Sequence, residues 1–152
     1  MKRMITGRLA LAALFLPAPA LADPALQVLG PDGAVVVTLP MPQGQEICLH
    51  WAHSVTGGEV ADCFENRANS LTLTRSYLHD FAAGLGEVQG RGTLKSDPGG
   101  GYWITDIDEG LPGNRLALRT GSSAVNHSLV ASTHKVDLPL NSALTLILTL
   151  PN

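Results

Sequence analysis

Short runs of aliphatic residues recur along most of the chain, and polar residues, Gly or Pro separate them. Along residues 71–76, Leu and Arg at odd positions alternate with Thr and Ser at even positions, and Leu alternates again along residues 116–119. This period of two indicates strands with one buried face, and no run shows helical periodicity over a convincing length. The pattern predicts strands at residues 26–29, 34–39, 46–52, 59–65, 71–78, 102–107, 115–119, 129–132 and 144–150.

Turn residues divide these runs into a regular series. The chain has 16 Gly and 10 Pro, and turn signals at intervals of roughly ten residues are typical of short antiparallel strands. We therefore expect an all-β fold, a small antiparallel sandwich or barrel-like domain of about nine short strands. Gly-rich segments at residues 79–92 and 96–101 are predicted loops, and the first is long enough to be a functional candidate.

The first 22 residues have the composition of an export signal. Three cations are followed by an eight-residue apolar run at residues 9–16 and by Ala20-Leu21-Ala22. This pattern predicts a signal peptide over residues 1–22, cleaved after Ala22, and a single β domain over residues 23–152. The apolar run falls short of the roughly 20 residues that span a bilayer, so we expect a periplasmic or secreted protein without stable membrane insertion.

Composition and charge narrow the functional classes. Hydrophobic residues make up 45% of the chain and charged residues 15%, which excludes disorder along its whole length. Cleavage would leave seven of the ten Lys and Arg residues against 13 Asp and Glu residues, a net charge of −6. No basic cluster remains, so nucleic-acid binding is not expected.

The two cysteines fit one hairpin register. Pairing Cys48 with Cys63 also places His53 opposite Gly58 and leaves a four-residue loop at residues 54–57, a common hairpin length. In an exported protein an even cysteine count favours a disulfide. Two buried thiols or a metal site are the alternatives, but no Cys-x-x-Cys motif supports zinc.

The histidines are the other candidates for chemistry. His50 and His53 lie three residues apart, and along a strand they would face opposite ways, which argues against a shared metal ion unless the strand ends before His53. We expect no metal and no cofactor. His53, Ser54, His127 and an Asp could be drawn as a hydrolase triad, but Ser54 lacks the Gly-x-Ser-x-Gly elbow.

Several short motifs, taken in order, resemble a known family. They are Trp51-Ala52-His53-Ser54-Val55, Phe64 on the next strand, Phe81-Ala82-Ala83-Gly84-Leu85-Gly86, and Leu118-Arg119-Thr120-Gly121 followed by His127. Together they resemble the exported bacterial proteins of domain-of-unknown-function family 1850, over most of the mature chain from Leu49 onward. The cysteine pair is not part of this resemblance.

The resemblance implies a partner class but no reaction. It implies a periplasmic or secreted domain whose gene often accompanies permeases of the tripartite ATP-independent periplasmic (TRAP) class, so the expected partners are such a permease, its solute-binding protein or a small ligand. Carried over by position, the candidate binding residues are His53, Ser54, Gly84, Leu85, Gly86 and His127. We therefore expect a non-catalytic accessory or binding module of a TRAP-type uptake system. The alternatives are a stand-alone β-sandwich that binds a small acid or a metal ion, and an unrecognised hydrolase.

Overall fold

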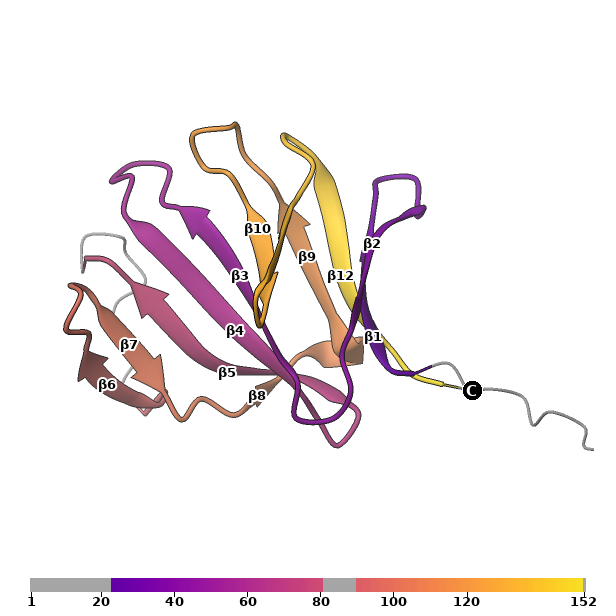
Figure 1. Ribbon diagram of the computed structural model, residues 1–152, viewed down its shortest axis with the longest axis horizontal. Coiled ribbons are helices and arrows are strands. Elements are labelled where there is room, and N and C mark those ends of the chain that lie inside the picture. The colour runs from indigo at the N-terminus through magenta and orange to yellow at the C-terminus, as the bar shows by residue number, and fades with distance from the viewer. Residues whose placement is uncertain (1–22, 81–89, 152) are drawn as a thin grey trace, which may run out of the picture.

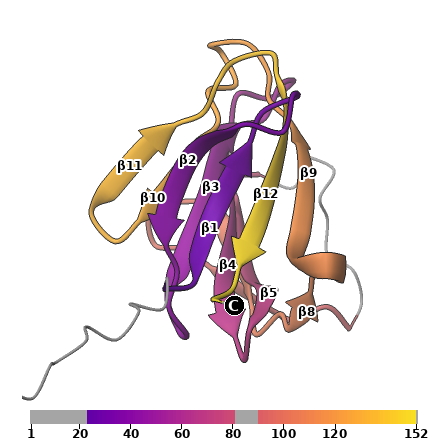
Figure 2. The same ribbon diagram turned by 90° about the vertical axis from the view of Figure 1, so that its right-hand side faces the viewer.

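The computed structural model describes residues 23–80 and 90–151, which form a sandwich of two antiparallel sheets (Figures 1 and 2). The smaller sheet contains, in spatial order, β2 (Val35–Pro40), β1 (Ala25–Leu29), β12 (Ala143–Thr149) and β9 (Arg115–Arg119). The larger sheet contains β11 (His134–Asp137), β10 (Ser128–Ala131), β3 (Glu46–Ala52), β4 (Glu59–Arg67), β5 (Ser70–Leu78), β7 (Tyr102–Thr105) and β6 (Thr93–Ser96), and β8 (Glu109–Gly110) pairs with β5. The predicted all-β sandwich is confirmed, and the sheets do not close into a barrel.

The core lies between the sheets and is built from the apolar faces of alternating strands. The smaller sheet contributes Leu26 and Val28 from β1 and three leucines of β12, and the larger sheet contributes residues such as Ile47, Leu49 and Phe64, all at most 3% exposed. Full burial of one such side chain is worth about 1.5–3 kcal/mol. Hydrophobic burial on both inner faces therefore holds the two sheets together.

A β-bulge in β5 changes which residues of that strand face the core. Cys63 pairs with Arg75 and Phe64 pairs with Leu73, so Thr74 is left over between them, and its hydroxyl donates to the carbonyl of Cys63 (3.1 Å). Leu73 before the bulge and Leu78 after it are both buried in the core, although they stand at odd and even positions. The extra residue shifts the alternation by one.

Three strands were not predicted. β6 and β11 are almost wholly exposed edge strands rich in polar residues, and β8 has only two residues, so none carries an apolar alternation. The loop predicted at residues 96–101 begins one residue later in the structure, because Ser96 ends β6. The prediction gave about nine strands, and residues 23–80 and 90–151 form twelve.

Four connections lie at the same end of the sandwich, at the top of Figure 1: β1–β2, β3–β4, β9–β10 and β11–β12. The β3–β4 hairpin has the predicted register, with Cys48 opposite Cys63 and the His53 amide donating to the Gly58 carbonyl (2.8 Å). The β9–β10 connection crosses from the smaller sheet to the larger one. Within the described residues, no helix is long and apolar enough to span a membrane.

Candidate functional site: a cavity at one end of the sandwich

A cavity of about 380 Å³ opens where the β3–β4 hairpin meets the β9–β10 connection. We call it the end cavity, and its lining residues are Trp51, His53, Ser54, Arg119, Gly121, Val125 and His127. Trp51 lies in β3 of the larger sheet, and His53 and Ser54 follow that strand. Arg119 is the last residue of β9 in the smaller sheet. The cavity therefore bridges the two sheets.

His127 is the buried member of the end cavity, with 7% of its surface exposed. Its ring stacks on the Trp51 indole, with centroids 5.8 Å apart and 13° between the ring planes. Burial lowers the pKa of His127 below its ordinary value of 6.5, because desolvation penalises the imidazolium. The Gly121 amide donates to Nδ1 (3.4 Å), so the neutral ring carries its proton on Nε2.

His53 has the same tautomer for a different reason. Its Nδ1 accepts hydrogen bonds from the backbone amides of Val55 and Thr56, both at 3.3 Å, and so caps the hairpin loop. The neutral ring then carries its proton on Nε2. Both histidines therefore offer an Nε2–H donor, and neither offers a free Nδ1 acceptor.

Arg119 adds a positive charge to the same cavity. In the part of the chain that the structure describes, no hydrogen bond or ion pair engages its guanidinium. Among the described residues that line the cavity there is no Asp or Glu. The described lining therefore combines one cation and two imidazole donors without a carboxylate.

Backbone contacts hold the β9–β10 connection against the end of β3 and against the β11–β12 connection. The Ala52 amide donates to the Val125 carbonyl (2.8 Å), and the Asn141 amide donates to the Gly121 carbonyl (3.0 Å). Gly121 packs so closely on Val125 that a Cβ at this position would lie 2.9 Å from a Val125 methyl carbon. The cavity wall thus depends on the absence of a side chain at residue 121.

The structure brings together three of the six residues expected to bind. His53, Ser54 and His127 line one cavity, and no hydrogen bond within the described residues joins the Ser54 hydroxyl to either imidazole. Gly84, Leu85 and Gly86 lie outside the described residues.

Sequence reasoning did not nominate four residues that line the same cavity: Trp51, Arg119, Gly121 and Val125. Three of them stood in the motifs that carried the family resemblance, but a motif match by itself assigns no role. The available signal for Arg119 was its position at the end of an alternating strand. This signal identifies a site residue only once the order of the strands in the two sheets is known.

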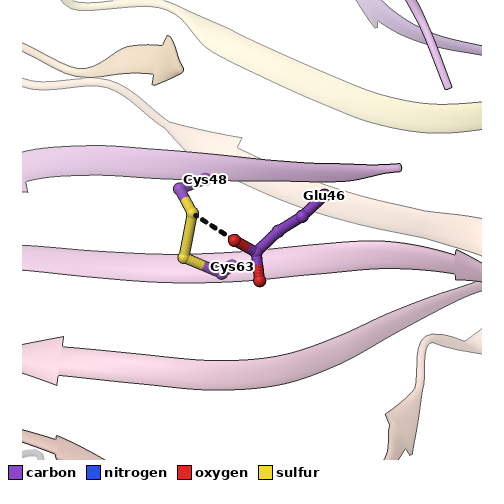
Figure 3. Close-up of side chains that lie close together, drawn as sticks. All are labelled: Glu46, Cys48 and Cys63. Atoms are coloured by element: carbon purple, nitrogen blue, oxygen red, sulfur yellow. Dashed lines mark hydrogen bonds between the residues drawn. A yellow bond between two sulfur atoms is a disulfide. The ribbon is translucent and has the colours of Figure 1, made fainter. Parts of the chain in front are cut away.

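His50 lies apart from the end cavity, and β3 ends at Ala52, before His53, so strand alternation does not set the relative orientation of these two histidines. The Nδ1 of His50 is 3.2 Å from a Glu59 carboxylate oxygen, and neither residue lines the end cavity. One cluster of metal-ligand types occurs in the described residues, formed by Glu46, Cys48 and Cys63 (Figure 3). The expected disulfide joins the two cysteines, so their sulfur atoms are not thiolate ligands here.

Residues 47–138 match the model of the family described as "Domain of unknown function (DUF1850)". The chain belongs to this family. The DUF1850 match contains every residue that lines the end cavity, and it leaves β1, β2 and β12 of the smaller sheet outside. No curated protein and no solved structure matches the chain.

Proposed function

We propose that this DUF1850 protein is a non-catalytic binding module that takes a small carboxylate-bearing ligand in its end cavity and serves a TRAP-type uptake system. The observation that carries the proposal is the lining of the end cavity: Arg119 and two imidazole N–H donors, with no acidic residue among the described residues that line it. The link to a TRAP permease or its solute-binding protein rests on the family resemblance alone.

The donor set favours a carboxylate over a neutral ligand. A guanidinium presents paired N–H donors that match the two oxygens of a carboxylate, and such charge-assisted hydrogen bonds are stronger than neutral ones. The Nε2–H groups of His53 and His127 provide further donors on other walls of the same cavity. The apolar surfaces of Trp51 and Val125 would contact the carbon skeleton of the ligand.

An exported location agrees with two features of the chain. The disulfide between Cys48 and Cys63 is typical of proteins in oxidising compartments. The N-terminal 22 residues have the composition of a signal peptide. A periplasmic module could meet a solute before or during its transfer to the permease.

Titration with acetate and succinate tests the binding part. The chain has two tryptophans, so the indole N–H resonances of the nitrogen-labelled protein can be assigned with Trp51→Phe and Trp103→Phe. We expect a saturable shift of the Trp51 resonance and a two- to fivefold weaker affinity, on the order of one exposed ion pair, in Arg119→Gln. Arg115→Gln is the matched control, because Arg115 is exposed on the same strand but does not line the cavity.

Loss of affinity in both arginine variants would show a general charge effect and contradict the proposed site, as would a titration without saturation. The transport part is tested separately in cells, by measuring solute uptake through a co-encoded permease with wild type, Arg119→Gln and Arg115→Gln. We expect Arg119→Gln alone to reduce uptake. Undiminished uptake in that variant would reject the role in transport and leave the binding result standing.

A further inference from the structure

The larger sheet has a second cavity, of about 280 Å³, on the face that carries the disulfide. It is lined by His50, Glu59, Ala61, Tyr77, Asp97, Gly99 and Trp103, and we call it the sheet-face cavity. None of these residues lines the end cavity. The two cavities therefore have separate walls and different chemistry.

Two aromatic side chains form one wall of the sheet-face cavity. Tyr77 and Trp103 are paired across β5 and β7, with ring centroids 5.2 Å apart and 52° between the planes. The Tyr77 hydroxyl donates to the Gly100 carbonyl (2.8 Å), which fixes the ring against the β6–β7 turn. The pair is thus held in place by the sheet and by the turn.

Gly101 allows this turn to approach Tyr77. Its φ is +75°, and a Cβ at this position would lie 2.6 Å from both the Tyr77 hydroxyl oxygen and the Leu78 carbonyl oxygen. The positive φ and the short contacts each disfavour any residue other than glycine at position 101. The aromatic wall therefore exists before any ligand arrives.

Acidic groups give the sheet-face cavity a negative charge. Glu59 and Asp97 line it, whereas no Lys or Arg does among the described residues. The pKa of Tyr77 is raised above its ordinary value, mainly by burial of its hydroxyl. The negative charges of Asp97 and Glu59 raise it further. Both carboxylates thus act on the same aromatic side chain.

The guanidinium of Arg75 lies over the Trp103 ring, and its charge is already paired. Arg75 lies 4.5 Å from the centroid of the Trp103 ring, and its N–H groups donate to the Glu46 carboxylate at 2.6 and 3.0 Å. Arg75 therefore neutralises Glu46 rather than the two acids of the cavity. His50, 3.2 Å from Glu59, is a basic side chain that lines the cavity itself, and Lys95 on β6 pairs with Trp103 in the sheet.

We propose that the sheet-face cavity binds the ammonium group of a small organic cation between the Tyr77–Trp103 pair and the carboxylates of Glu59 and Asp97. Aromatic faces attract ammonium groups through the ring quadrupole, and carboxylates add direct charge pairing. This site has the opposite charge preference to the end cavity, so it does not depend on the function proposed above.

Titration with choline, and with its uncharged carbon isostere dimethylbutanol, tests the proposal. We expect choline to give a saturable shift of the Trp103 indole resonance with little effect on that of Trp51, and dimethylbutanol to give no saturable shift. Glu59→Gln and Asp97→Asn should each weaken choline binding about two- to fivefold, as for an exposed charge pair. Asp108→Asn removes an exposed acid that does not line the cavity and should leave the affinity unchanged.

Three results would overturn the site. Equal binding of choline and dimethylbutanol would show an apolar contact only. Equal weakening by all three acid substitutions would show a general effect of net charge. A choline titration without saturation would show that the cavity is not a cation site.

Discussion

The imidazole of His127 stacks on the indole of Trp51, with centroids 5.8 Å apart and planes inclined by 13°. This contact joins the β9–β10 connection to the end of β3, and the Val125 carbonyl reinforces it by accepting from the Ala52 amide (2.8 Å). The stack also removes His127 from solvent and directs Nδ1 toward the Gly121 amide. The conformation of the β9–β10 connection and the protonation of the His127 imidazole are therefore linked.

Gly121→Ala should destabilise the protein by about 1–3 kcal/mol, the usual cost of overpacking. The new methyl group would lie 2.9 and 3.0 Å from two Val125 side-chain carbons, so the connection must shift. Urea unfolding measures the change in the free energy of unfolding. Adding Val125→Ala should restore part of the loss in the double variant, because it removes the clashing methyl groups.

Gly99→Ala is the control for Gly121→Ala. The nearest atom to a Cβ at Gly99 is 3.8 Å away, so this substitution adds a methyl group without overpacking. If Gly121→Ala/Val125→Ala loses as much unfolding free energy as the two single variants together, a direct clash between residues 121 and 125 is contradicted.

Lowering the pH should destabilise the fold through His127. Its pKa is lowered in the folded state, so between that pKa and 6.5 the unfolded chain binds more protons than the native protein. The stabilising contribution is complete above pH 6.5 and is lost as the pH falls through the folded pKa. Unfolding free energies measured from pH 7.5 to 5 should fall less steeply in His127→Asn than in wild type.

His134→Asn is the matched control, because His134 is exposed on β11. An identical slope in wild type and His127→Asn would show that other groups cause the pH dependence.

Asp62→Asn should stabilise the protein at pH 7. Asp62 accepts a hydrogen bond from the Ser76 hydroxyl at 2.6 Å, and burial raises its pKa above 3.8 despite that bond. The penalty for the ionised form is complete above the raised pKa and disappears as the pH falls below 3.8. Asparagine keeps an acceptor oxygen without the charge, so the gain in unfolding free energy at pH 7 should vanish in acid.

Asp137→Asn removes an exposed carboxylate and provides the comparison. A loss of stability at pH 7 in Asp62→Asn would mean that the charge strengthens the Ser76 bond by more than burial costs.

Loss of the disulfide should lower the free energy of unfolding by about 3 kcal/mol, the chain-entropy value for a loop of this size. Cys48 and Cys63 are separated by 15 residues and are bonded in the structure. The measurement compares urea unfolding of oxidised wild type with that of Cys48→Ala/Cys63→Ala. Reductant should reduce the stability of wild type and leave the double variant unchanged, whereas equal sensitivity of both would exclude the disulfide as the cause.

Export should remove residues 1–22, so the mature chain should begin at Asp23. Three cations, a short apolar run and Ala20-Leu21-Ala22 motivate this expectation. Intact mass of protein recovered from the periplasm measures it. Full-length chain in the cytoplasm would contradict export, and Ala22→Arg should block cleavage if the site is correct.

Local signals explain which features could be predicted. Alternating apolar positions and turn residues located strands β3 and β9 to the residue, because a strand with one buried face carries its period of two in the sequence itself. The Cys48–Cys63 disulfide could be predicted because the register that pairs the two cysteines leaves a four-residue loop between β3 and β4, which is a common hairpin length.

Features that depend on contacts between distant segments could not be obtained in this way. The bulge at Thr74 shifts the buried face of β5, and polar β11 forms a strand only because β10 provides its partner. Arg119 reaches the wall shared by His53 and His127 because β9 belongs to the smaller sheet and its connection crosses to the larger one. Sheet order is set by burial of the whole core, and burial is a property of the folded chain that no local pattern of residues encodes.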